Sequence, residues 1–190
     1  LDFITVNKKD IRWSKFILMM TIQLKTGMRV SELCNIRKRN INKNLKQIKI
    51  VGKGDKIRKL NFVDDADKSL WKLILQQYDK SGNDGLYLFY RTRVVEYLSK
   101  KKTVELDVDI SLPTTSSYYL QRFREMREEL GLRKIITSHS IRRYFITEFV
   151  KSNSKELLKQ IIGHTSDRRV NYYVGDMIEE TTTTTIDIGI

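Results

Sequence analysis

Two blocks of the sequence contain the residue types that bind and react with phosphate. In Gly-Met-Arg29-Val-Ser-Glu32, an arginine follows a glycine turn and a glutamate lies three residues later. In His139-Ser-Ile-Arg142, the histidine and the arginine are three residues apart and therefore share one face of a helix. Two guanidinium groups can hold the non-bridging oxygens of a phosphodiester and neutralise the charge of its pentacoordinate transition state.

Three further residues could transfer protons or attack phosphorus. Lys53 lies between two glycines, His164 follows an apolar run, and Tyr173 lies nine residues after that histidine. Lysine and histidine can move protons, and a tyrosine hydroxyl can form a covalent phosphotyrosine. The ordinary pKa of tyrosine is about 10, so neighbouring cations would have to favour the phenolate.

The same set of residues contains neither a carboxylate cluster for magnesium nor a glycine-rich nucleotide-binding loop. One cysteine, Cys34, and two histidines do not make a tetrahedral zinc site without carboxylates. We therefore expect chemistry that uses no metal and no cofactor.

The net charge of the 190-residue chain is +13, and much of it is local. Residues 37–59 contain ten lysines and arginines but only one acidic residue. Because the neutralisation of phosphates requires cations along one surface, the cluster predicts nucleic acid as the partner. The candidates for contact with the DNA backbone are Arg37, Lys38, Arg39, Lys56, Arg58 and Arg143.

The composition, with 40% hydrophobic and 31% charged residues, is typical of one globular domain. The longest apolar run is five residues, whereas a membrane span needs about 20. A single cysteine favours a reducing, cytoplasmic compartment, at the nucleoid if the source is bacterial.

The elements that must position these residues are mainly helices. Apolar spacing predicts helices over about 10–25, from 31, and over 64–78, 114–130, 138–150, 155–162 and 167–174. Residues 47–51 and 56–62 alternate apolar and polar around a glycine turn, which predicts a β-hairpin with its cations on the exposed face. Residues 85–89 suggest a short extended piece, and residues 91–112 are helix-like at 94–98 and alternate at 103–110. The expected fold class is mainly α with a small antiparallel β-sheet (α+β).

In their order and spacing, five blocks resemble the tyrosine recombinase (phage integrase) family, across about residues 10–175. They are Thr-Gly-Met-Arg29-Val-Ser-Glu32, Gly-Lys53-Gly-Asp-Lys-Ile-Arg, His139-Ser-Ile-Arg142, Ile-Ile-Gly-His164 and Tyr173. Each block is weak alone, whereas the ordered combination is specific.

The resemblance implies a role for each matched residue. Arg29 and Arg142 would clamp the scissile phosphate, and Lys53 would be the general acid for the departing 5′ oxygen. His139 and His164 would bind the phosphate and assist proton transfer, Tyr173 would be the nucleophile, and Glu32 would support the site.

The resemblance also implies an organisation and a partner. Residues 1–176 would form the catalytic domain of a Xer-like or mobile-element recombinase, and residues 177–190 a tail that can dock on a neighbouring protomer. The protein would act on double-stranded DNA as a homotetramer on paired sites, away from membranes. The N-terminal core-binding domain usual in the family is expected to be absent from this chain.

Two departures from the family pattern and three other functions stay open at this stage. Arg143 stands where the family usually has a histidine, and residues 91–112 look like a charged insertion with no family role. The same residues could serve a type IB topoisomerase, a metal-independent ribonuclease using His139 and His164, or a non-catalytic DNA-binding module.

Overall fold

A computed structural model of the chain describes residues 11–52, 57–62, 65–80, 82, 85–97 and 104–162. The helices in this part are α2 (Ile11–Thr26), α3 (Val30–Cys34), α4 (Asp65–Lys80), α5 (Ser116–Glu129), α6 (Ser138–Ser152) and α7 (Lys155–Ile162), with a 3-10 turn η1 (Lys38–Asn40). The strands are β1 (Ile41–Asn42), β2 (Gln47–Val51), β3 (Ile57–Asn61), β4 (Tyr90–Tyr97) and β5 (Val104–Pro113).

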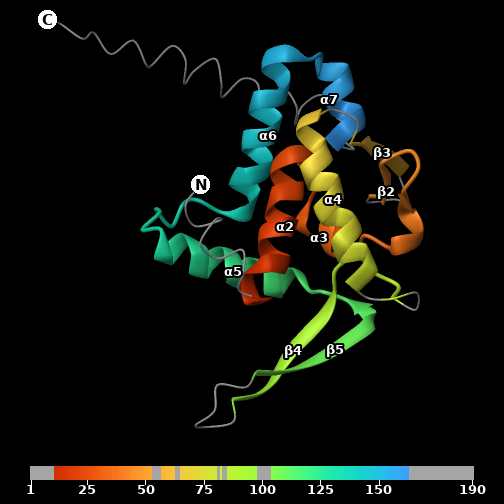
Figure 1. The fold of residues 1–190 in the computed structure, drawn as a ribbon. Coiled ribbons are helices and arrows are strands. Elements are labelled where there is room, and N and C mark those ends of the chain that lie inside the picture. Colours follow the sequence, from red (N-terminus) through yellow and green to blue (C-terminus); the bar gives the residue numbers. More distant parts are fainter. Residues whose placement is uncertain are drawn as a thin grey trace, which may run out of the picture.

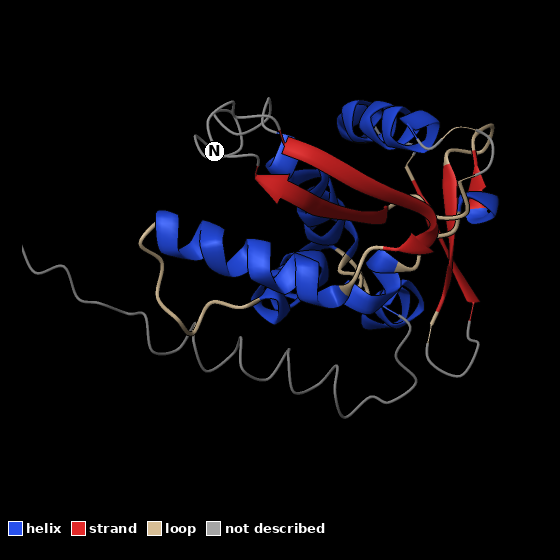
Figure 2. Ribbon diagram, turned by 90° about the horizontal axis from the view of Figure 1, so that it is seen from below, coloured by secondary structure: helices blue, strands red, loops and turns tan. Residues whose placement is uncertain are grey.

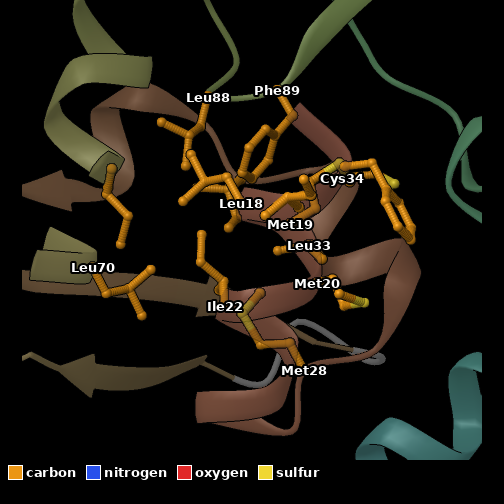
Figure 3. Close-up of a cluster of buried hydrophobic side chains, with 14 of the residues drawn as sticks. Leu18, Met19, Met20, Ile22, Met28, Leu33, Cys34, Leu70, Leu88 and Phe89 are labelled. Atoms are coloured by element: carbon orange, nitrogen blue, oxygen red, sulfur yellow. The ribbon is translucent and has the colours of Figure 1, made fainter. Parts of the chain in front are cut away.

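Helix α2 forms the centre of the core. Phe16, Met19 and Ile22 have no exposed surface, and α2 packs against α3, α4, α5 and α6 (Figure 1). Figure 3 shows Met19 and Ile22 among side chains from α3, α4 and the segment before β4. Full burial of one such side chain stabilises the folded state by about 1.5–3 kcal/mol. Because several side chains of α2 are buried in this way, the helix is a firmly packed support for the turn that follows it.

That turn leaves α2 through Gly27, whose φ is +60°. A Cβ atom at this position would lie 2.3 Å from Cδ1 of Phe145 on α6. Glycine is therefore required both by the backbone conformation and by the close approach of α6. The next side chain, Met28, is buried in the core (Figure 3), and Arg29 follows it at the start of α3.

The predicted hairpin is present as β2 and β3, and β1 adds a third antiparallel strand at the β2 edge. Lys49 and Lys59 are cross-strand partners and both are exposed, as expected. The expectation that all cations of the hairpin face solvent is wrong at Arg58, which is buried, while its neighbour Ile57 is 56% exposed. The reason is that the Glu32 carboxylate lies beneath the sheet and binds the Arg58 guanidinium.

Strands β4 and β5 pair as a second antiparallel sheet, so the helix-like interpretation of 94–98 is wrong over 94–97, while residue 98 lies outside the described residues. The β-branched and aromatic residues of β4 favour a strand, and a stretch this short has no decisive periodicity. The hairpin extends away from the helices in Figure 1, and Figure 2 shows it as a sheet separate from β1–β3. Lys15 on α2 holds its base, because its Nζ donates to the Tyr90 carbonyl (3.2 Å) and to Thr92 Oγ1 (2.8 Å).

The remaining predictions for the fold have three outcomes. Helices α4, α5, α6 and α7 lie within two residues of their predicted bounds, and the fold class, mainly helical with small antiparallel sheets, is confirmed. The predicted extended piece at 85–89 is limited to a single bridge between Tyr87 and Arg37. The helix predicted over 167–174 and the tail lie outside the described residues.

Among the described helices, none has the length and apolar character needed to cross a membrane.

Candidate active site

Arg29 is held by the carboxylate of Glu32. The Nη1 atom of Arg29 donates to Oε1 of Glu32 at 2.9 Å, and the backbone N–H of Arg29 donates to Oε2 at 3.0 Å. The Arg29 side chain keeps 32% of its surface exposed, whereas that of Glu32 keeps 6%. One buried carboxylate therefore fixes both the backbone and the guanidinium of an arginine that still reaches solvent.

The same carboxylate binds a second arginine, Arg58 on β3. Its Nη2 atom donates to Oε2 of Glu32 at 2.7 Å and its Nη1 atom to Oε1 at 3.2 Å, a two-pronged contact. Burial alone would raise the pKa of Glu32, but the hydrogen bonds and charge of Arg58, followed by those of Arg29, hold the pKa below its ordinary value. Glu32 is therefore an anion between two cations.

Arg142 on α6 is buried and contacts backbone carbonyls. Its Nη1 atom donates to the carbonyl of Gly27, and its Nη2 atom donates to the carbonyl of Ile162 at 3.1 Å. Gly27 lies two residues before Arg29, and Ile162 ends α7 two residues before His164. Arg142 thus connects the turn that carries Arg29 with the end of α7.

His139 is exposed at the second position of α6, one turn before Arg142 on the same side of the helix. Arg143 is exposed one turn after His139. Thr137 caps the N-terminus of the helix, and its backbone N–H donates to Oγ of Ser140 at 3.1 Å. The structure therefore brings Arg29, Glu32 and Arg142 together around Gly27, with His139 at the near end of α6.

The other predicted catalytic residues, Lys53, His164 and Tyr173, lie outside the described residues, as does Lys56. Gly52, the residue before Lys53, and Arg29 both line one groove on the surface of the protein. The catalytic assignments remain predictions.

The exposed cations of residues 37–59 surround a groove next to Arg29. It has a volume of about 960 Å³, and its lining includes Arg29, Glu32, Arg37, Arg39 and Lys49. A second depression of about 420 Å³ shares Arg39, Asn40 and Lys49 with it and adds, among others, Lys43 and Lys59. We call the two together the basic groove. It starts at Arg29 and follows β1–β3.

Not every predicted backbone-contacting cation faces this groove. Arg37 and Arg39 are exposed in it, with Arg37 5.5 Å from the Tyr87 ring. Lys38 is buried, donates to the Gly82 carbonyl and lies 4.1 Å from the Tyr78 ring. Buried Lys38 and buried Arg58 have protein partners, whereas Arg37 and Arg39 face solvent.

Lys49 and Lys59 were not singled out from the sequence, although a signal was present. The alternation of the two strands places both side chains on the outer face, and the register makes them cross-strand neighbours. Among the described residues, no three histidine, cysteine, aspartate or glutamate side chains gather as metal ligands would. What these residues offer is cations: Arg29 and Arg142 at the turn, and the basic groove beside them.

The chain is similar to known proteins in sequence and in fold. Residues 3–179 match the model of the phage integrase family. A tyrosine recombinase XerC of Leptospira interrogans is 27% identical over 175 residues, which cover 92% of this chain and 50% of that protein. The chain therefore spans about half the length of the curated relative.

Two solved structures share the fold. The XerA recombinase superposes with a TM-score of 0.65 at 22% identity, over 95% of this chain and 60% of that one. The integrase of transposon Tn1549, in complex with circular intermediate DNA, superposes with a TM-score of 0.63 at 18% identity, over 90% and 57% of the two chains.

Proposed function

The chain belongs to the phage integrase family, and from this membership we propose that it is the catalytic part of a site-specific DNA recombinase. The observation that carries the proposal is that Arg29 lines the basic groove while Arg142 binds the carbonyl of Gly27, two residues before Arg29. A groove of exposed cations suits a DNA backbone, and guanidiniums held by protein partners at the adjoining turn suit the phosphate that reacts.

In the proposed reaction, the phenolate oxygen of Tyr173 attacks the scissile phosphorus. A bond forms between that oxygen and phosphorus, the bond to the 5′ oxygen breaks, and Lys53 gives the leaving oxygen its proton. The products are a 3′-phosphotyrosyl link and a free 5′ hydroxyl. Attack by the 5′ hydroxyl of a partner strand reverses the step, so rejoining needs no external energy.

The described residues supply the electrostatic part of this reaction. Arg29 and Arg142 offset the negative charge that grows on the phosphate oxygens, and His139 donates a hydrogen bond to the same group. The carbonyls of Gly27 and Ile162 fix Arg142 before DNA binds. Preorganised charge of this kind costs no rearrangement during the reaction.

The basic groove is the proposed track for the DNA backbone. Arg37, Arg39, Lys49 and Lys59 are exposed along it, starting from the side of Arg29. Lysines and arginines at a surface neutralise phosphates without reading bases. These residues therefore supply affinity that falls with salt, and not choice of sequence.

We further propose that the reaction integrates or excises a mobile element, which is supported by the fold likeness to a transposon integrase. The working form would be a homotetramer on two DNA duplexes, in the cytoplasm, with residues 1–176 as the catalytic domain. Residues 177–190 would dock on a neighbouring protomer. Sedimentation of the protein with its captured DNA tests the tetramer, and deletion of 177–190 should reduce the assembly to monomers on DNA.

A trapping experiment tests the chemistry. The protein is mixed with duplexes that carry a fixed nick and random flanking sequence, so that the short 5′-hydroxyl fragment leaves after cleavage and the adduct accumulates. A denaturing gel should show an adduct in the parent and in Tyr172→Phe, and none in Tyr173→Phe. An adduct that persists in Tyr173→Phe and is lost in Tyr172→Phe would overturn the assignment.

The other functions give different results in the same set of assays. Relaxation of supercoiled plasmid at no specific site would indicate a type IB topoisomerase. RNA cleavage that persists in Tyr173→Phe would indicate a ribonuclease. Salt-dependent binding to DNA with no adduct would indicate a binding module.

A further inference from the structure

We propose that Arg58 is a positioning residue, which fixes the direction of the Arg29 guanidinium by clamping Glu32 from the opposite side. The proposal rests on the proposed function, in which Arg29 binds the reacting phosphate. Arg58 itself would not touch DNA, in contrast to the sequence-based expectation.

The first support is the geometry of the three side chains. Arg29 and Arg58 together place four hydrogen bonds on the two carboxylate oxygens of Glu32, two on each oxygen, at 2.7–3.2 Å. A carboxylate has about four acceptor positions, so this one is fully occupied. Rotation of the Glu32 carboxylate would break contacts to both arginines, and the direction of Arg29 is therefore coupled to Arg58.

The second support is burial. The side chains of Arg58 and Glu32 are only 7% and 6% exposed, whereas that of Arg29 is 32% exposed. A buried ion pair is seldom more stabilising than apolar residues of the same volume, because both charges lose their water. A buried pair that contacts one partly exposed arginine fits a positioning role better than a purely stabilising one.

The third support is the weakness of the local structure that carries Glu32. Helix α3 has five residues, too few to be stable by itself. Arg58 belongs to β3, which is paired with β2 over its whole length. The ion pair thus fixes a short helix to a sheet, and the sheet strands flank the residues 53–56 that include Lys53.

The test compares four variants of the protein with the parent. Arg58→Lys keeps the charge but loses the two-pronged contact, and Arg58→Met removes both. The double variant Glu32→Gln with Arg58→Met also removes the uncompensated carboxylate. Lys72→Met, an exposed cation on α4, is the matched control for loss of one positive charge.

Three quantities are measured for each variant. They are the single-turnover rate of adduct formation on a nicked duplex captured from the random pool, the dissociation constant for that duplex, and the thermal unfolding midpoint. In addition, ¹⁵N NMR follows the Nε–H resonance of Arg29, assigned by its loss in Arg29→Lys. The NMR measurement requires no DNA cleavage.

We expect Arg58→Lys to slow adduct formation about tenfold and Arg58→Met about 100-fold, since a shift of about 1 Å in a reacting group can cost that much. The dissociation constants should stay within about twofold, because the groove phosphate contacts are unchanged. The double variant should recover the unfolding midpoint of the parent but not its rate of adduct formation. The Nε–H resonance of Arg29 should be broadened by exchange both in Arg58→Met and in the double variant. Lys72→Met should match the parent throughout.

Three results would overturn the proposal. If rate and unfolding midpoint recover together in the double variant, the pair only stabilises the fold. If Arg58→Met weakens DNA binding at unchanged rate, Arg58 contacts the backbone itself. If the parent forms no adduct, the proposed function fails, while an unchanged Arg29 resonance in Arg58→Met would separately refute the coupling.

Discussion

The two buried arginines, Arg58 and Arg142, and the exposed cations of the basic groove carry the same charge in opposite surroundings. Arg58 and Arg142 are buried, and each terminal nitrogen with a described contact donates to a carboxylate or carbonyl at a fixed position. Arg39, Lys49 and Lys59 are exposed along an open depression. Each buried arginine is held in one position by its protein partners, whereas the exposed side chains along the groove are held less tightly.

The positive residues of the chain therefore fall into two groups: one can stabilise a transition state, and the other can bind the DNA backbone. A transition state gains from charge only when the charge is in place, which requires buried partners. Any cation within reach of a DNA backbone increases the affinity of the protein for DNA, and salt weakens this contribution. We therefore expect substitutions near Gly27 to change rates and folding, and substitutions in the groove to change affinity.

The largest expected effect is that of Arg29→Lys on the rate. A lysine cannot reproduce both the contact with Glu32 and the contact with phosphate proposed for Arg29, so adduct formation should slow by about 10²–10³-fold. The dissociation constant for DNA should change by less than about threefold, because the groove contacts remain. Single-turnover kinetics with Arg124→Lys, an exposed arginine on α5, as control checks this. A loss of affinity in step with the rate would remove the distinction between the two regions.

The next effect concerns Lys15, a buried cation whose hydrogen-bond partners among the described residues are the Tyr90 carbonyl and Thr92 Oγ1. Burial lowers its pKa to about 8 in the folded protein, from 10.5. The unfolded chain then binds more protons than the folded one between about pH 8 and 10.5, so stability rises with pH across this window, by about 3 kcal/mol at most.

The measurement is the unfolding free energy of the parent and of Lys15→Met from pH 7 to 11. The free energy of unfolding of the parent should rise relative to that of Lys15→Met as the pH increases from about 8 to 10.5. Burial raises the pKa of Cys34 to about 11, and its charge interacts with that of Lys15, so both proteins carry Cys34→Ala to remove this opposing contribution. A difference that is constant with pH would mean that Lys15 keeps an ordinary pKa.

Gly27→Ala should destabilise the turn between the two regions. Its φ of +60° costs an alanine about 1–2 kcal/mol, and the contact with Phe145 adds about 1–3 kcal/mol. Gly82→Ala is the matched control, because its φ is +62° but no atom of the described residues lies within 4 Å of the added Cβ. Equal losses in urea unfolding would show that the approach of α6 does not constrain the turn.

The smallest effect per residue is expected in the groove. Lys49→Gln should reduce the slope of log K against log salt by about 0.9, and Lys49→Gln with Lys59→Gln by about twice that. Titration of a labelled duplex at several salt concentrations measures the slope. Arg58→Met should leave the slope unchanged, and a reduced slope there would assign Arg58 to the groove.

The sequence predicted the long helices and the residues near the turn, and the physical reasons are local. Helix periodicity is repeated over several turns in α2, α4 and α6, and Gly27 marks a stop that has no alternative. The spacing of His139 and Arg142 fixes a common helix face before any packing is known.

The misses have tertiary causes. Arg58 is polar and lies in an alternating strand, and only the position of Glu32 on another element explains why it faces inward. Lys38 is buried through contacts with Gly82 and Tyr78, more than 35 residues away. The hairpin β4–β5 depends on cross-strand pairing, which local propensity does not encode.

Mass spectrometry of the trapped adduct tests whether Tyr173 carries the DNA strand in the proposed reaction. The trapped adduct is digested with nuclease and protease, and the peptide that retains a nucleotide is sequenced by fragmentation. We predict a single modified residue, Tyr173, linked to a 3′ phosphate. A nucleotide on Tyr172, on another side chain or through a 5′ phosphate would contradict the proposed reaction.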